Sequence, residues 1–138
     1  MNKGHRDLRV WQQAMTLVET VYRATKTFPA DERFGLTSQM RRAAVSVPSN
    51  IAEGRGRGTD AELIRFCCIA YGSLMELETQ SELAHRLGFL PNESLEPIMS
   101  ACVDVGRMLN ALRSSLVVGH RSSAKKSPAD DRRPTTDD

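Results

Sequence analysis

The sequence has 138 residues, of which 40% are hydrophobic, 26% are charged and 5% are aromatic. This length suffices for one domain, whose core must consist mostly of aliphatic side chains. The formal net charge is only +2, which excludes a globally basic nucleic-acid binder. No apolar run approaches the roughly 18 residues of a membrane span. The N-terminus lacks the apolar run of a signal peptide, so we expect no contact with a membrane.

The cysteines are Cys67, Cys68 and Cys102, an odd number without a CxxC pair. Neighbouring side chains on a helix diverge by about 100°, so the adjacent Cys67 and Cys68 are poorly placed to form a disulfide. We interpret all three as reduced packing residues of a cytoplasmic protein.

The first predicted helix covers about residues 7–27 and ends before Pro29. Apolar residues recur in it at steps of three and four, which is typical of an amphipathic helix. They form two adjacent stripes: Leu8, Trp11, Met15, Val18 and Tyr22 in one, and Val10, Leu17, Val21 and Ala24 in the other.

The second predicted helix covers about residues 36–55, and its apolar spacing continues through Pro48 to Ile51. Proline removes a backbone donor and pushes on the carbonyl of Ala44, so we expect a kink at Pro48 and not a stop. The side chain of Ser46, Ser49 or Asn50 would satisfy the freed carbonyl, directly or through water. The expected buried stripe of this second helix consists of Leu36, Met40, Ala43, Ala44, Val47 and Ile51.

Glycines from Gly54 to Gly58 predict the end of this helix, and Thr59 with Glu62 predicts a capping box that starts the next. The third helix covers about residues 60–87. Its main apolar face is Leu63, Phe66, Ala70, Leu74, Leu77, Ser81 and Ala84. An adjoining arc holds Ile64, Cys68, Tyr71 and Met75. This apolar surface is wider than a monomer needs, so the helix is either central or in contact with another subunit.

The fourth predicted helix covers about residues 93–117, with a heptad-like stripe from Leu95 to Leu116. Residues 119–138 are polar and aperiodic, which predicts a disordered tail after a domain of residues 1–118. Four amphipathic helices with short connections favour an all-α, up-down-up-down antiparallel four-helix bundle.

A four-helix bundle invites a di-iron site, which needs two ExxH pairs and two further glutamates. The chain has a single ExxH, from Glu82 to His85, so we expect no metal and no cofactor. A nucleophile elbow is missing. Glutamates such as Glu53, Glu76 and Glu78 are better explained as solvated or paired with arginines than as acid–base pairs. We therefore expect no enzyme activity and no catalytic residue.

Four arginines are candidate contacts to nucleic-acid phosphates: Arg41, Arg42, Arg55 and Arg57. Arg41 and Arg42 flank the apolar stripe of the second helix, where phosphate contacts and salt bridges to carboxylates are both open. Arg55 and Arg57 precede a helix N-terminus, whose amides attract anions. The alternative there is an ordinary flexible connection. No aromatic ladder accompanies these arginines, so the sequence gives little support for base stacking.

The segment from Phe34 to Gly54, FGLTSQMRRAAVSVPSNIAEG, resembles the bacterial four helix bundle protein family, also called ribosomal-RNA intervening-sequence proteins. The matching segments ELIRF (62–66) and AYGSLME (70–76) extend the resemblance, which covers about residues 6–117. The family fingerprint SxPxNIxEG falls on Ser46, Pro48, Asn50, Ile51, Glu53 and Gly54.

The resemblance implies a helical bundle that assembles into a ring-shaped homopentamer. A related branch of the family serves diversity-generating retroelements, where it binds reverse transcriptase and nucleic acid through a basic surface. No catalytic residue follows from the family. We therefore expect a non-enzymatic homo-oligomeric scaffold, with an RNA- or DNA-binding accessory protein as the alternative. The expected interface or structural residues are Ser46, Pro48, Asn50, Glu53, Ile64, Tyr71 and Met75.

Overall fold

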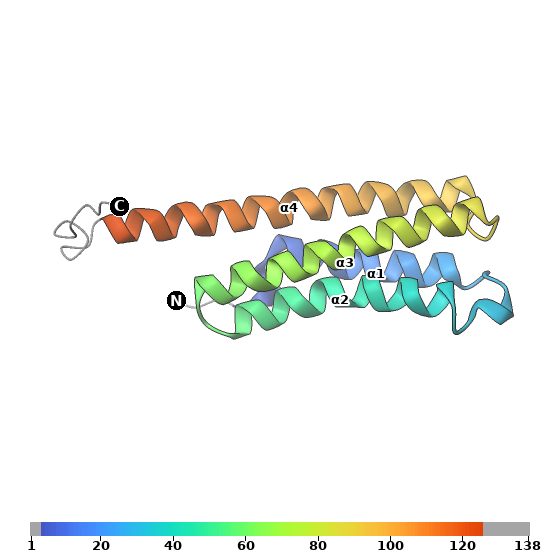
Figure 1. Cartoon of the computed structure of the whole chain (residues 1–138), viewed down its shortest axis with the longest axis horizontal. Helices are drawn as coiled ribbons and strands as arrows, with labels where there is room; N and C mark the ends of the chain where they lie inside the picture. The colour runs from blue at the N-terminus through green and yellow to red at the C-terminus, as the bar shows by residue number, and fades with distance from the viewer. Residues whose placement is uncertain (1–3, 126–138) are drawn as a thin grey trace, which may run out of the picture.

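The computed structural model describes residues 4–125, and side chains up to residue 119. Four long helices make up the fold: α1 (Arg9–Thr25), α2 (Leu36–Gly56), α3 (Asp60–Arg86) and α4 (Asn92–Lys125). Short 3-10 turns precede α1 (η1, His5–Asp7) and α2 (η2, Ala30–Glu32). The helices lie nearly parallel to one long axis, and the connections alternate between its ends (Figure 1).

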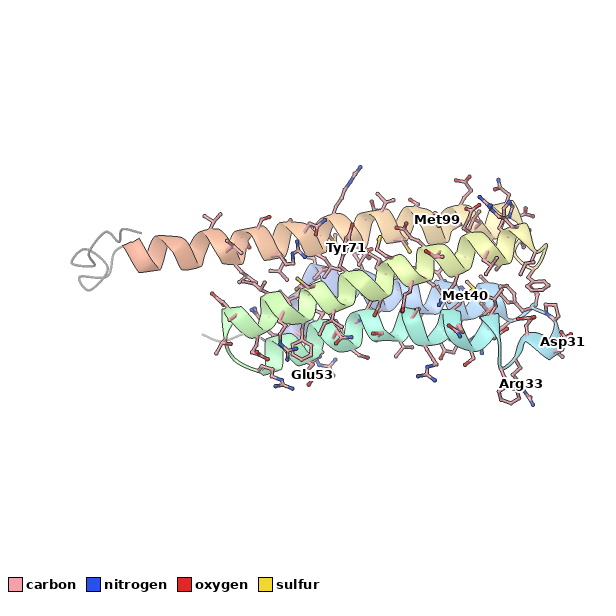
Figure 2. All side chains as sticks on the ribbon, viewed as in Figure 1. Asp31, Arg33, Met40, Glu53, Tyr71 and Met99 are labelled. Carbon is pink, nitrogen blue, oxygen red and sulfur yellow. The ribbon has the colours of Figure 1, made fainter. Side chains whose placement is uncertain are left out.

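Each helix packs against two neighbours: α1 on α2, α2 on α3, α3 on α4 and α4 on α1. This cyclic order confirms the predicted all-α four-helix bundle. The core is aliphatic, as the composition requires, and Met40 lies inside the bundle (Figure 2). Its largest fully buried side chains include Leu17, Met40, Ile51, Leu74, Leu77, Ile98 and Leu109.

The two apolar stripes of α1 differ in how deeply their side chains are buried. Val10, Leu17 and Val21 are at most 5% exposed, so this stripe faces the core. The other stripe lies at the edge of the bundle, where Met15 is 41% exposed and Tyr22 is 40% exposed. Leu8, Trp11 and Val18 of this stripe are partly buried against the core, so Met15 and Tyr22 are its exposed members.

Helix α2 continues through Pro48, which is buried inside it. The kink predicted at Pro48 stays a prediction. A close approach to α3 follows at Gly54, where a Cβ atom would lie 2.7 Å from Cβ of Phe66 and 3.2 Å from Cα of Leu63. Gly54 is thus a contact residue inside the helix, which ends at Gly56, one residue past the predicted end at residue 55.

Helix α3 begins as predicted, because the hydroxyl of Thr59 accepts a hydrogen bond from the amide of Glu62 at 3.2 Å. All residues of its main apolar face are buried, including the hydroxyl-bearing Ser81. The helix ends at Arg86, and Gly88 follows two residues later with a φ of +84°, which favours glycine. The amide of Phe89 then bonds back to the carbonyl of Ala84 at 2.9 Å.

Helix α4 runs to Lys125, so the prediction of a tail from residue 119 is wrong for residues 119–125. Gly119 is the one glycine in residues 119–125, and a single glycine costs about 1 kcal/mol, which does not stop a long helix. Residues 126–138 lie outside the described residues. Helix α4 extends past the other three helices (Figure 1). No helix in residues 4–125 is both long and apolar enough to cross a membrane.

Candidate functional site

A cleft of about 530 Å³ lies over the first half of α2 and contains several arginines. We call it the arginine cleft, and no carboxylate lines it. Its lining residues are Tyr22, Arg33, Thr37, Ser38, Arg41, Arg42, Val45 and Ser46. Guanidinium groups and hydroxyls around one hollow are suited to binding an anion such as phosphate.

The adjacent Arg41 and Arg42 have different roles in this cleft. Nε of Arg41 donates to the hydroxyl of Thr25 at 2.8 Å, and Nη2 donates to the carbonyl of Tyr22 at 3.3 Å. The guanidinium also lies 4.4 Å from the centroid of the Tyr22 ring. These contacts tie α2 to the end of α1. Arg42 is exposed and makes no such contact with the described residues, so its guanidinium is available to a ligand.

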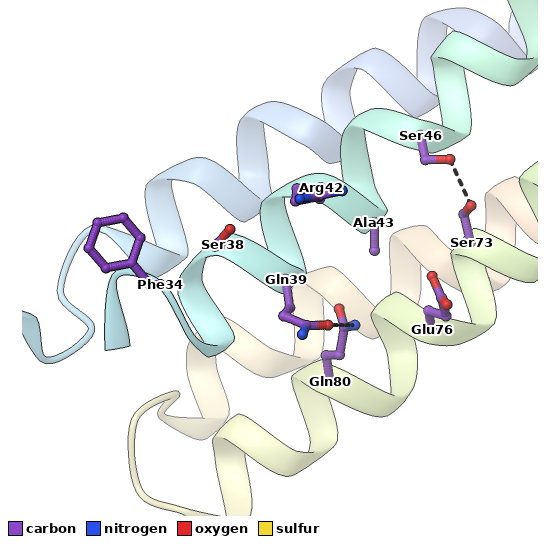
Figure 3. Close-up of a pocket in the computed structure, with 9 residues that line it drawn as sticks. All are labelled: Phe34, Ser38, Gln39, Arg42, Ala43, Ser46, Ser73, Glu76 and Gln80. Carbon is purple, nitrogen blue, oxygen red and sulfur yellow. Dashed lines mark hydrogen bonds between the residues drawn. The ribbon is translucent and has the colours of Figure 1, made fainter. Parts of the chain in front are cut away.

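A second cleft, of about 510 Å³, lies between α2 and α3 (Figure 3). We call it the α2–α3 cleft. At its floor the hydroxyls of Ser46 and Ser73 share a hydrogen bond of 2.8 Å. Farther along, Nε2 of Gln80 donates to Oε1 of Gln39 at 3.3 Å. The remaining lining residues are Phe34, Ser38, Arg42, Ala43 and Glu76.

The arginines at the other end of α2 have carboxylate neighbours. Arg57 lies 2.9 Å from a carboxylate oxygen of Glu53 and 3.6 Å from one of Glu62. The hydrogen bond to Glu53 raises the pKa of Arg57 above its ordinary value. Arg55 lines a small hollow of about 60 Å³ together with Asp60. The structure therefore does not bring the predicted pairs Arg41/Arg42 and Arg55/Arg57 into one patch.

The polar residues of the fingerprint hold α2 together around Pro48. The side-chain nitrogen Nδ2 of Asn50 donates to both the backbone carbonyl and the hydroxyl of Ser46, each at 2.8 Å. The prediction placed such a bond on the carbonyl of Ala44, but the described bond goes to Ser46. Asn50 is half-buried and Glu53 is exposed. Ser46 also reaches α3 through Ser73, so this part of the fingerprint has a structural role within one chain.

The residues predicted to form a subunit interface on α3 are partly covered by this chain. Tyr71 and Met75 are half-buried and pack against the core. A Cβ atom on Gly106 of α4 would lie 3.4 Å from the Tyr71 ring, so α4 covers that ring. Ile64 is half-buried as well. The apolar excess predicted on α3 is therefore smaller than the sequence suggests.

A third cleft, of about 330 Å³, lies between the first half of α1 and the second half of α2. We call it the apolar groove. Met15, at 41% exposed, and Val45, at 39% exposed, are its most open apolar side chains. It is lined by His5, Trp11, Met15, Val18, Val45, Pro48, Ser49 and Ala52. The buried ring of Pro48 thus belongs to the wall of a surface groove.

Comparison with known families identifies the chain. The sequence model of the 23S rRNA-intervening sequence protein family matches residues 6–111, which include every lining residue of the three clefts except His5. The chain belongs to this family. No curated protein shows significant similarity to it.

Among solved structures, this family member is similar to a crystal structure described as a protein of unknown function from the S23 ribosomal protein family of Bacteroides thetaiotaomicron. The two chains are 20% identical, and the match covers 75% of this chain and 97% of that one with a TM-score of 0.68. At this identity the likeness shows a shared fold.

Sequence reasoning missed several cleft residues of this family member. Arg33 and Phe34 lie between the first two predicted helices, where a basic residue beside an aromatic one, just before a helix, was a signal in the sequence. Gln39 and Gln80 are 41 positions apart, and no local pattern pairs them. The sequence predicts Glu76 to be solvated or paired with an arginine, and gives no sign that it lines a cleft.

The cysteines of this family member are free, and they occupy two kinds of environment. Burial raises the pKa of Cys67 to about 11 and that of Cys102 to about 12. Cys68 is exposed, and its sulfur lies 3.2 Å from Nη1 of Arg113. The prediction that all three are packing residues is therefore wrong for Cys68.

Proposed function

We propose that this family member is a non-enzymatic scaffold that works in the cytoplasm as a ring-shaped homo-oligomer. The observation that carries the proposal is the apolar groove between α1 and α2. Its side chains Met15 and Val45 are 41% and 39% exposed, and Trp11 and Val18 lie beside them. Burying such a surface against a second copy releases water from apolar side chains and favours association.

The free end of α4 supports the same proposal. Leu112 and Leu116 are only partly buried, while Val117 is 36% exposed and Val118 is 63% exposed. This end extends past the other helices (Figure 1). If the apolar end of α4 on one copy binds the groove of the next copy, the contact between them is head-to-tail. Such contacts close into a ring when the rotation from each copy to the next adds up to one full turn. The family resemblance implies five subunits.

Light scattering after size-exclusion chromatography tests the oligomer. The proposal expects a mass near five times the 15.3 kDa of one chain, and a lower mass for the variant Met15→Glu. Ile69→Glu is the matched control, because Ile69 is also 41% exposed but lies outside the apolar groove. A monomer at micromolar concentration would refute the proposal.

Two glutamates that are candidates for acid–base chemistry pair with arginines, which supports a non-enzymatic role. Glu53 pairs with Arg57, and Glu82 pairs with Arg86 at 3.3 Å, each one helical turn away. Both are exposed or nearly so, where water screens them. In the described part of the chain, no group of three His, Cys, Asp or Glu side chains is placed to hold a metal ion.

A second candidate function is favoured by the arginine cleft. We propose that this cleft binds nucleic-acid phosphate, as an accessory protein of an rRNA-associated element or of a reverse transcriptase would. Arg33, Arg41 and Arg42 line it without a carboxylate among them. The near-neutral net charge of +2 means that binding would be local to this cleft.

A salt-dependent titration tests this candidate. The affinity of full-length protein for labelled RNA should fall as salt rises, by a slope of about one counterion per phosphate contacted. Arg42→Ala should weaken binding and flatten that slope. Arg107→Ala on α4 is the control, because Arg107 is exposed and does not line the arginine cleft. Absence of salt-dependent binding to RNA and DNA would remove the candidate.

A further inference from the structure

The arginine cleft and the α2–α3 cleft adjoin each other. Ser38, Arg42 and Ser46 line both, and the exposed Arg42 stands between them. The volumes of about 530 and 510 Å³ are each within the range of small-ligand sites. A ligand with two chemically different ends can therefore occupy both hollows across the surface of α2.

The two hollows differ in charge. The arginine cleft has three arginines and no carboxylate in its lining. The α2–α3 cleft has the carboxylate of Glu76, which makes no hydrogen bond or ion pair with the described residues. The α2–α3 cleft is lined by both Arg42 and Glu76, whose charges offset each other, so a phosphate is attracted more strongly to the arginine cleft. Glu76 instead accepts hydrogen bonds, such as those from an amino group or a ribose hydroxyl.

The amide groups of the α2–α3 cleft leave an acceptor unused. Gln80 donates to Gln39, but its own Oε1 is buried and has no hydrogen-bond partner. Both amides lie in the space between α2 and α3 (Figure 3). A buried acceptor without a partner is unfavourable, so a ligand gains affinity where the Gln80 amide turns and brings Oε1 to a donor on that ligand. Amino and imino groups on the edges of nucleobases are such donors.

An aromatic ring lies at one end of the same cleft. Phe34 is 86% exposed, and the guanidinium of Arg33 lies 5.1 Å from its ring centroid. A phenylalanine this exposed gains nothing for folding, whereas its face offers a stacking surface for a base. Figure 3 shows the ring at the end of the cleft beyond Ser38 and Gln39.

From these observations we infer that the two clefts together bind one unstacked nucleotide. The phosphate lies against Arg33, Arg41 and Arg42, and the base stacks on Phe34 with its edge at the amides of Gln39 and Gln80. The inference rests on the second candidate function and specifies its ligand. Bases inside a duplex are not accessible to such a site, so a single strand or a free nucleotide is the source.

Fluorescence anisotropy with full-length protein tests this inference. The probes are a labelled single-stranded RNA of about 12 nucleotides, the same sequence as a duplex, and unlabelled AMP as competitor. Phe34→Ala and Gln80→Leu should each weaken single-strand binding about tenfold and leave duplex binding unchanged. Displacement by AMP identifies a free nucleotide as a source, whereas displacement only by an unlabelled strand identifies nucleic acid; both support the site.

Matched controls separate this site from general charge attraction. Val103→Ala removes another exposed apolar side chain, at 46% exposure on α4, and Gln13→Leu removes an exposed amide on α1. Neither should change binding. If RNA binds with salt dependence but Phe34→Ala and Gln80→Leu behave as the parent, the nucleotide site is wrong and the second candidate function stands. If no probe binds, both are wrong.

Discussion

A pair of arginines lies toward each end of α2, but only the pair Arg41 and Arg42 includes an arginine that is available to a ligand. Arg57 lies between Glu53 and Glu62, and its charge is neutralised within the chain. At the other end, Arg42 lines two clefts and has no carboxylate partner among the described residues. Figure 2 shows Arg33 and Glu53 at opposite ends of the bundle. The neighbours, and not the residue type, decide what an arginine can do.

Gly54→Ala should have the largest effect on stability, because α2 approaches α3 closely at this position. The added methyl would lie 2.7 Å from Cβ of Phe66, and overpacking of this kind costs about 1–3 kcal/mol. The free energy of unfolding in urea, measured with circular dichroism, gives the value.

Gly72→Ala on α3 is the control for this change. A Cβ atom there has no neighbouring atom within 4 Å, so the better helix propensity of alanine should stabilise the protein by about 0.5–1 kcal/mol. If both alanine variants were equally stable, the close packing at Gly54 would be contradicted.

Toward the other end of α2, the variants Arg41→Ala and Arg42→Ala should separate the structural role of Arg41 from the binding role of Arg42. Arg41 loses its bonds to Thr25 and Tyr22, which should cost about 1–2 kcal/mol. Arg42→Ala should change stability by less than about 0.5 kcal/mol and should weaken anion binding. Thermal unfolding of the two variants, with and without RNA, measures both effects. Equal destabilisation by the two would contradict the division of roles.

The thiols extend the comparison to a second residue type, since Cys67 and Cys68 are adjacent but differ in burial. Iodoacetamide at pH about 8 should modify Cys68 alone, and mass spectrometry of the intact chain should find one adduct. A rapid second adduct in folded protein would contradict the burial of Cys67 and Cys102.

The buried thiols of Cys67 and Cys102 should make the stability of the protein depend on pH. Their pKa values are raised from 9.0 to about 11 and about 12 in the folded chain. Above pH 9 the unfolded chain therefore releases protons that the folded chain keeps. The free energy of unfolding should fall as pH rises from about 9 through these folded values. Denaturant unfolding at pH 8 and 10, compared with a Cys67→Ala, Cys102→Ala variant, measures the difference.

Arg57→Ala should have the smallest effect, because exposed ion pairs contribute little to stability. Any loss should shrink as salt rises from about 0.01 to 1 M, over which the screening length falls from roughly 30 to 3 Å. Urea midpoints at the two salt concentrations measure it. A large, salt-independent loss would mean that the packing of Arg57 on Phe66, at 5.1 Å from the ring centroid, matters more than its charge.

Local patterns were sufficient to predict the helices and their buried faces. The steps of three and four in α3 identify a face that is buried in full, and Thr59 and Gly88 mark its ends because capping depends on residues within one turn. The same reasoning failed at residues 119–125, where a single glycine and polar side chains are compatible with both a helix and a tail. It also overestimated the free apolar surface of α3, since α4 covers Tyr71.

The sequence by itself determined a four-helix bundle with an aliphatic core, because helical periodicity and capping are properties of neighbours along the chain. Only the tertiary structure decided which arginine stays available, because Glu62 of α3 pairs with Arg57, whereas Arg42 forms no ion pair with a carboxylate of the described residues. It also brought Gln39 to Gln80 and Phe34 to the end of their cleft. Charge pairing and cleft formation depend on distances in space between separate helices, which a one-dimensional pattern does not contain.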